Sequence, residues 1–383
     1  MDRYRSLDGL RGVAALAVVF WHVSLVVPAF TDVILRGEEP AAGSVAWWLT
    51  RTPFAAFEVG HEAVLLFFIL SGFVLTLQLN RGPLTSRRMR EYYGRRLTRL
   101  YVPVWAAVGL AVVLALLVAR NPNAPSLWLA THDAPSPTEV MKGATLLAGS
   151  TGLNTPLWSL TWEIWFSLTL PLILLTLRWV RMEKWWPVAI ALCIATSASA
   201  AVVQWSLPIP ALAMILEYPP VFVVGVIIAL KWQQIISLTG HVPWLFGLVL
   251  VAAVTAAQSM VVASPLVEAT LHAGTLIGLA FVVVAAVRYG PFGRVLEVRP
   301  VHWLGSRSFS LYLIHEPIIV AMALLVGAAA WWPWLLIALG TLPLILAGTE
   351  LFYRMVERPS LRLSKKVGSW AAGSVVPPEV QTS

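Results

Sequence analysis

Long apolar runs recur along the chain and are separated by short polar segments. A helix needs roughly 20 mostly apolar residues to cross the hydrocarbon core of a bilayer, and helices are the usual way to satisfy backbone hydrogen bonds there. The pattern therefore predicts an all-α, polytopic membrane helical bundle of about ten transmembrane helices. The expected spans are approximately residues 8–29, 60–79, 100–119, 156–177, 187–205, 211–230, 243–262, 268–287, 306–327 and 333–353.

Composition supports a lipid environment. Hydrophobic residues make up 58% of the chain and charged residues 12%, against about 25% charged residues in ordinary soluble domains. A soluble fold of this length could not bury so much apolar surface in one core. The lipid bilayer is therefore an expected partner, and we expect a multi-pass protein of the plasma membrane.

The basic residues are distributed unevenly between alternate loops. Lys and Arg are concentrated in the second, fourth, sixth and eighth loops and in the C-terminal segment, while the other loops contain only Arg36, Arg51, Arg120 and Lys142. Because cytoplasmic loops carry an excess of Lys and Arg, this alternation predicts that both termini are cytoplasmic. It also explains the net charge of +8, so we expect no nucleic-acid partner. Residues 1–363 are expected to form one membrane domain, and residues 364–383 a disordered cytoplasmic tail.

The first predicted span contains three polar residues that are costly in hydrocarbon. Each charge there costs at least ~2.5–3.5 kcal/mol, yet the span contains Asp8, Arg11 and His22. Eleven residues of helix return to nearly the same face and cover roughly 16 Å. Asp8 lies one turn before Arg11 and can pair with it. A snorkelling Arg and a hydrogen-bonded His are the structural alternative, but His22 is too deep to snorkel. His is also the side chain best suited to accept a hydroxyl proton near neutral pH.

Two further spans contain polar groups at a similar depth. Glu163 begins the fourth span at the same end as His22 and is the expected carboxylate that orients it; the alternative is a Glu favoured at a helix N-terminus. Tyr312 and His315 share one face of the ninth span, beside Ser308, Ser310 and Glu316. They fit either a functional role or a structural hydrogen-bond cluster between helices.

The second loop ends in a basic segment close to the membrane. Arg95, Arg96 and Arg99 are its last arginines. These arginines either only orient the helices in the membrane and attract anionic lipid, or they recognise phosphate, because the planar guanidinium fits a phosphate group. Coenzyme A carries several phosphates, and acyl-CoA is cytosolic. No P-loop, GxGxxG, HExxH or GxSxG motif is present, and we expect no bound metal or cofactor.

Six sequence blocks together resemble the acyltransferase-3 family of membrane O-acyltransferases. Arg11 and His22 match the R-x10-H signature of that family. One departure is residues 61–66, where many relatives have an Asp before a Phe-Phe pair. The matching blocks are residues 6–22, 67–73 including Ser71, 93–103, 158–163, 309–315 and 357–359.

The resemblance implies ten core spans and transfer of an acyl group, often acetyl from acetyl-CoA, to a carbohydrate or another hydroxyl. It also implies that His22 is the catalytic base, Arg11 its essential partner, and Arg95, Arg96 and Arg99 donor or structural contacts. Asp8, Ser71, Tyr312 and His315 are expected to support the substrate or the site.

We therefore expect an O-acyltransferase that uses acyl-CoA as co-substrate and a hydroxyl-bearing acceptor, with His22 assisted by Glu163. The alternative is a proton-coupled secondary transporter of a small polar solute, with Arg11, His22 and Glu163 as a proton relay. Transporters often show internal repeats, and none is visible here. A transporter also gives no reason for the arginines of the second loop.

Overall fold

The structure is a computed structural model that describes residues 5–373, apart from 133, 148, 150, 180–182, 208, 262–263 and 328–330. Helices dominate this part of the chain, and no strand occurs in it. In chain order the elements are α1 (Arg5–Ser24), α2 (Pro28–Arg36), α3 (Val45–Thr50), the 3₁₀ helix η1 (Pro53–Phe57), α4 (Gly60–Leu79), α5 (Ser86–Leu117), α6 (Leu127–Ala130), α7 (Pro137–Thr145), α8 (Leu157–Trp179), α9 (Trp186–Ser206), α10 (Pro210–Leu230), α11 (Trp232–Leu238), α12 (Phe246–Met260), α13 (Pro265–Arg288), α14 (Gly290–Leu296), α15 (Arg299–Val326), α16 (Trp331–Phe352), the π helix η2 (Tyr353–Glu357) and α17 (Arg358–Ala371).

Eight of these helices are long and apolar enough to cross a membrane, which confirms the predicted all-α membrane bundle. They coincide with eight of the ten predicted spans. The predicted span at 243–262 is wrong in length, because α12 has 15 residues and reaches only about 22 Å. The predicted span at 333–353 corresponds to the helix α16, which is not among the eight. The side chains of residues 331–338 lie outside the part of the chain that the structure describes. The cytoplasmic location of the termini stays a prediction.

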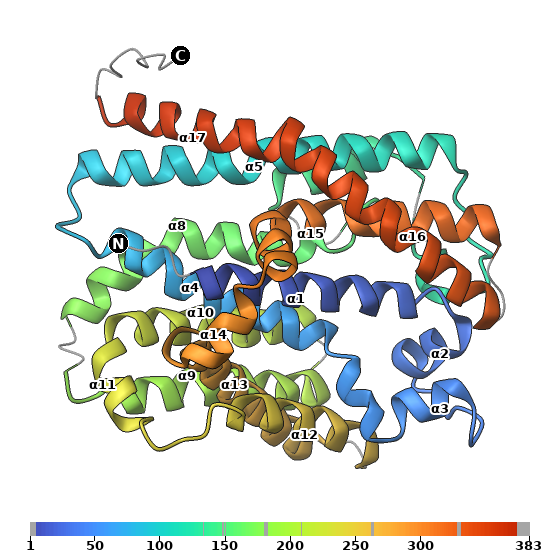
Figure 1. Cartoon of the computed structure of the whole chain (residues 1–383), viewed down its shortest axis with the longest axis horizontal. Helices are drawn as coiled ribbons and strands as arrows, with labels where there is room; N and C mark the ends of the chain where they lie inside the picture. The colour runs from blue at the N-terminus through green and yellow to red at the C-terminus, as the bar shows by residue number, and fades with distance from the viewer. Residues whose placement is uncertain are drawn as a thin grey trace.

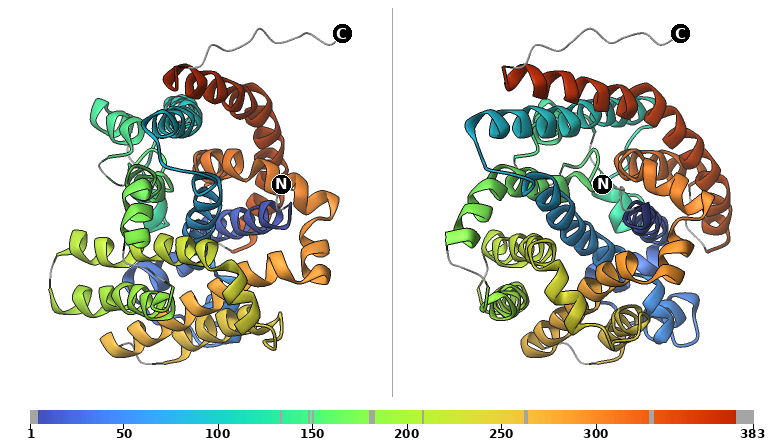
Figure 2. Two further views of the ribbon diagram at one scale, coloured as in Figure 1. Left: turned by 90° about the vertical axis from the view of Figure 1, so that its left-hand side faces the viewer. Right: turned by 60° about the vertical axis from the view of Figure 1, so that its left-hand side comes forward.

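Helix α1 lies inside the bundle, between α15 and α4 (Figure 1). The pair α5 and α17 covers one side, whereas α9, α10, α12 and α13 form the opposite side (Figure 2). The short helices α2 and α3 lie at the end of the bundle where α1 ends (Figure 1). The polar residues of the first span therefore face other helices on several sides, as ionisable groups in membrane helices generally do.

The approach of α1 to α15 depends on two glycines. A Cβ atom on Gly12 would lie 2.5 Å from the backbone N of Gly305, and a Cβ on Gly305 would lie 2.1 Å from the carbonyl oxygen of Asp8. Small residues let membrane helices approach this closely. Their contact sets the distance between the polar residues of the two helices.

Gly12→Val is expected to lower the stability of the folded protein by about 1–3 kcal/mol, because the helices must separate to accommodate the side chain. The melting temperature of the detergent-purified protein measures the effect. Gly109→Ala is the control, because nothing lies within 4 Å of a Cβ there. Equal melting temperatures for Gly12→Val and wild type would contradict the close α1–α15 contact.

The end of the chain differs from the sequence prediction. Helix α17 continues to Ala371 and packs on α5, so residues 364–371 of the predicted disordered tail are helical. The reason is a close contact: Gly368 lies so near α5 that an added Cβ would be 2.4 Å from Cγ of Arg95. Residues 374–383 lie outside the described residues.

Candidate active site

Three histidines meet at the C-terminal end of α1, and all are held in the same way. His22, His132 and His315 each place Nδ1 against the backbone carbonyl four residues earlier, at 2.9, 2.8 and 3.1 Å. A carbonyl only accepts, so Nδ1 is the donor in each ring. The Nε2 atoms are therefore left for contacts between the helices.

The fully buried carboxylate of Glu316 joins this cluster. It accepts hydrogen bonds from the backbone N and the hydroxyl of Thr155, both at 2.9 Å. His132 Nε2 lies 2.6 Å from Oε1 of Glu316, so these two groups form a hydrogen-bonded pair. Oε2 of Glu316 is 3.7 Å from Nε2 of His22. A proton accepted by His22 would thus be stabilised by a negative charge on the neighbouring helix.

His22 is the accessible member of the cluster. Its side chain is 12% exposed, whereas those of Glu316 and His132 are 0% exposed. His315 Nε2 lies 3.1 Å from Nδ1 of His22 and helps to fix the orientation of the ring. With Nδ1 occupied, Nε2 of His22 is the ring nitrogen that can accept a proton.

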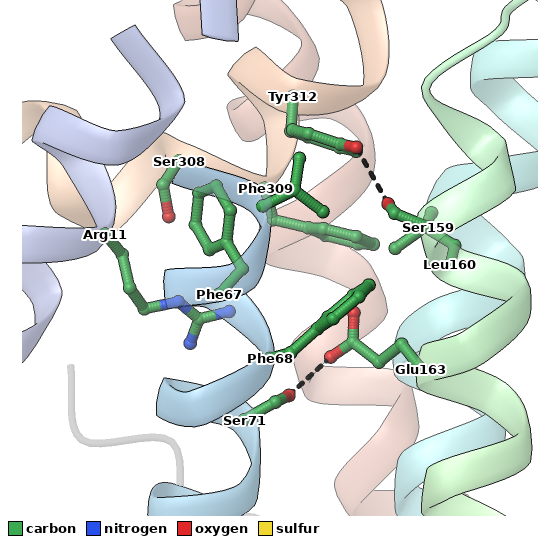
Figure 3. Close-up of a pocket in the computed structure, with 11 residues that line it drawn as sticks. Arg11, Phe67, Phe68, Ser71, Ser159, Leu160, Glu163, Ser308, Phe309 and Tyr312 are labelled. Atoms are coloured by element: carbon green, nitrogen blue, oxygen red, sulfur yellow. Dashed lines mark hydrogen bonds between the residues drawn. The ribbon is translucent and has the colours of Figure 1, made fainter. Parts of the chain in front are cut away.

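A separate narrow cavity lies nearer the N-terminal end of α1 (Figure 3). It has a volume of about 30 Å³, enough for a single water molecule. Arg11 extends into it from α1, opposite Glu163 of α8. Nε of Arg11 is buried without a hydrogen-bond partner in the described part of the chain, and the predicted pairing of Arg11 with Asp8 stays a prediction.

Glu163 is bound to groups on other helices. It accepts a 2.8 Å hydrogen bond from Ser71 of α4 and pairs with the buried Arg96 of α5. Arg96 also donates to Ser167 Oγ at 2.9 Å. The prediction that Glu163 orients His22 is therefore wrong, because the carboxylate of Glu163 is bound by Ser71 and Arg96. Glu163 thus points towards α4 and α5, and Glu316 takes the place beside His22.

The three arginines of the basic segment have different surroundings. Arg96 is buried in its ion pair with Glu163. Arg95 is exposed and pairs with Glu91 of its own helix at 2.5 Å. Arg99 lies close enough to Arg11, Arg96, Glu163 and Glu357 for electrostatic interaction with each. Arg11 and Arg99 thus bring positive charge next to the cavity, while Arg95 lies away from it.

Helix α15 connects the cavity with the histidine cluster. Ser308 and Tyr312 line the cavity, and the Tyr312 hydroxyl lies 2.7 Å from Ser159 Oγ (Figure 3). One turn later, His315 and Glu316 belong to the cluster, with the rings of Tyr312 and His315 5.8 Å apart. The polar face of α1 from Arg11 to His22 therefore lies along a polar face of α15.

Two residues of the site were missed by the sequence analysis. His132 and Arg120 lie in the segment between α5 and α7, where charge has no membrane cost and gave no signal. All three guanidinium nitrogens of Arg120 are buried without a hydrogen-bond partner among the described residues. Burial lowers the pKa of Arg120, and the negative charge of Glu316 acts in the opposite direction. Arg120 is thus a cation near Glu316 that has unused hydrogen-bond donors.

These features define a class of protein: an integral membrane protein with a cluster of histidines and a carboxylate at one end of a helix and arginines at the other. The chain belongs to the family described as "Acyltransferase domain", whose profile matches residues 4–351, and it is an acyltransferase that transfers groups other than aminoacyl groups. This confirms the resemblance found in the sequence.

Two relatives illustrate the family. The acyltransferase MdmB of Streptomyces mycarofaciens is 29% identical over 399 residues, which cover 94% of this chain and 92% of MdmB. The peptidoglycan O-acetyltransferase OatA of Listeria monocytogenes is 21% identical over 395 residues, which cover 92% of this chain but only 55% of OatA. No solved structure matches the chain.

Proposed function

We propose that this protein is an O-acyltransferase of the plasma membrane. It transfers an acyl group, in the first place acetyl, from cytosolic acyl-CoA to a hydroxyl of a carbohydrate or glycosylated acceptor. The observation that carries the proposal is the partly exposed side chain of His22, whose Nδ1 is engaged and whose Nε2 has Glu316 beside it. This is the arrangement that a general base needs.

In the proposed step, one proton moves from the acceptor hydroxyl to coenzyme A by way of His22. His22 Nε2 takes the proton of the acceptor hydroxyl while the hydroxyl oxygen attacks the thioester carbonyl of the donor. The new C–O bond forms, the C–S bond breaks, and coenzyme A leaves as a thiolate that takes up the proton. Glu316 stabilises the positive charge of His22 between these events.

The donor is expected to enter near the arginines. Phosphate groups of acyl-CoA would be bound by Arg99 and Arg11, because charge-assisted hydrogen bonds from guanidinium to phosphate are strong. The acyl end then has to travel along the polar faces of α1 and α15 towards His22. The cavity on this path is narrow, so its lining side chains, including Phe67 and Phe68, must move when the donor binds.

Arg99→Gln is expected to raise the KM for acetyl-CoA by about 10–100-fold, the effect of losing a hydrogen bond to a charged group. Steady-state kinetics of the purified enzyme measure this change. The control is Arg95→Gln, because the exposed Arg95–Glu91 pair contributes little. An equal rise in KM for both variants would show that the whole basic segment attracts the donor without a specific contact.

Arg120→Ala is expected to raise the KM for the acceptor by about 10–100-fold and to leave the KM for acetyl-CoA unchanged, because its unused donors lie near Glu316, away from the Arg11 cavity. The two KM values are measured separately by varying one substrate at a time. Arg51→Ala is the control, since Arg51 is paired with the exposed Glu39. A change in donor KM alone would place Arg120 on the donor path.

The proposal as a whole is tested with membranes that contain the protein, labelled acetyl-CoA and a panel of hydroxyl acceptors. The expected result is label in the acceptor together with one free thiol of coenzyme A for each acetyl group transferred. Accumulation of the solute in proteoliposomes without acyl-CoA, and no transfer of label to any acceptor, would favour the transporter alternative.

A further inference from the structure

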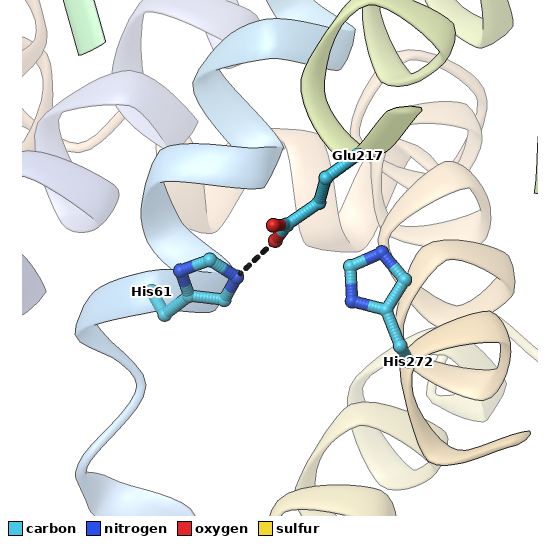
Figure 4. Close-up of side chains that lie close together, drawn as sticks. All are labelled: His61, Glu217 and His272. Atoms are coloured by element: carbon cyan, nitrogen blue, oxygen red, sulfur yellow. Dashed lines mark ion pairs between the residues drawn. The ribbon is translucent and has the colours of Figure 1, made fainter. Parts of the chain in front are cut away.

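His61, Glu217 and His272 converge from three helices although they lie far apart in the sequence (Figure 4). His61 is in the first turn of α4, Glu217 is in α10 and His272 is in α13. Each offers one ligand atom, and these atoms all lie within 4.8 Å of one another. Nε2 of His61 is 3.2 Å from Oε1 of Glu217. These residues belong neither to the His22 cluster nor to the Arg11 cavity.

The three side chains line a cavity of about 310 Å³ whose wall is partly polar and partly apolar. Gln204, Gln258 and Glu268 contribute further polar side chains to its wall. His61 is exposed, and Glu217 and His272 are half-buried. The group therefore lies open at the surface of the helix bundle, and the cavity has room for water or another ligand beside it.

The tautomer of His272 leaves a nitrogen free for a ligand. Ser197 Oγ donates a 2.7 Å hydrogen bond to the backbone carbonyl of Glu217. The same oxygen lies 2.8 Å from Nε2 of His272, and because its proton is used, it accepts from Nε2–H. Nδ1 of His272 then carries the lone pair. A second hydrogen bond that fixes the ring of a metal-binding histidine is the usual arrangement.

We propose that His61, Glu217 and His272 bind a Zn²⁺ ion whose fourth position is open to the cavity. Two imidazoles and one carboxylate are a ligand set that zinc takes with an open position, at about 2.0–2.2 Å from each atom. Ligand atoms around such an ion are roughly 3.3–3.5 Å apart. The 3.2 Å distance between Nε2 of His61 and Oε1 of Glu217 is close to this separation. The other ligand atoms have to move inwards, which the exposed side chain of His61 allows.

The ligand chemistry argues against the common hard cations. Calcium and magnesium prefer oxygen ligands, whereas imidazole suits zinc and other transition metals. The proposal departs from the sequence-based expectation of no bound metal. Three ligands separated by more than 50 residues each form no sequence motif, so only the packing of α4, α10 and α13 brings them together.

The test is Zn²⁺ binding by the full chain, purified in detergent and stripped with a chelator. We expect one ion per chain, a higher melting temperature on zinc addition, and a Co²⁺-substituted form with the visible absorption of a four-coordinate N/O site. His61→Ala and His272→Ala should each weaken binding by at least about 100-fold, and Ser197→Ala by about 10-fold. None of these readouts depends on acyl transfer.

His241→Ala is the matched control, because His241 is exposed and outside the group; it should bind zinc as wild type does. Size-exclusion profiles identify any variant that is misfolded, and the milder Ser197→Ala then decides. The proposal is overturned if the wild-type chain binds no stoichiometric zinc, or if His61→Ala, His272→Ala and Ser197→Ala bind it as tightly as wild type.

Discussion

His22→Ala is expected to lower the rate of acyl transfer by about 10²–10⁴-fold, the contribution of a positioned general base. The side chain is the accessible member of the cluster, and its Nδ1 is already occupied by the Val18 carbonyl. Removing it leaves no group at the position of Nε2 to take the hydroxyl proton. The measurement is the initial rate of label transfer from acetyl-CoA to the acceptor at saturating substrates.

His302→Ala controls for the loss of an imidazole elsewhere, because His302 lies in the first turn of α15, 13 residues before His315 and roughly 20 Å from it along the helix. It should retain the wild-type rate. A His22→Ala enzyme that transfers acetyl at the wild-type rate, with an unchanged melting temperature, would show that another group acts as base.

Glu316→Gln is expected to cause a loss of similar size, about 10²–10⁴-fold. Glutamine has nearly the same shape, and its carbonyl oxygen can still accept from His132 or Thr155. It removes the negative charge 3.7 Å from His22 Nε2, so the imidazolium formed in the reaction is no longer stabilised. The loss should appear in kcat and leave the KM for acetyl-CoA nearly unchanged, because Glu316 lies away from the arginines.

Glu350→Gln is the matched control, since it removes a carboxylate that pairs with Arg307 and Arg354, away from the cluster. If Glu350→Gln and Glu316→Gln reduce the rate equally, the effect is a general loss of stability and has no connection with His22.

The sequence predicted the helices and the importance of α1 because both depend on the cost of polar groups in lipid. Arg11 and His22 could be identified without a fold, since each lies in a run that should contain only apolar side chains. The span at 243–262 was overestimated because hydropathy does not give the ends of a helix, and α12 begins only at Phe246 and ends at Met260.

The partners of these residues could not be predicted in the same way. Depth counted along the helices put Glu163 at the same end of the bundle as His22, but the structure places Glu163 opposite Arg11, nearer the N-terminal end of α1. The direction of a side chain depends on which helices are neighbours, and α15 is the neighbour that brings Glu316 to His22. His132 and Arg120 come from a connecting segment, where a polar residue is ordinary and its burial becomes visible only in three dimensions.

The most direct test of the central claim, that His22 and Glu316 act as one unit in acyl transfer, is the rate of the double variant His22→Ala/Glu316→Gln compared with each single variant. Groups that act as a unit have strongly non-additive effects. The double variant is therefore predicted to transfer acetyl about as fast as His22→Ala alone. Losses that multiply would contradict the claim, because they would show that Glu316 acts independently of His22.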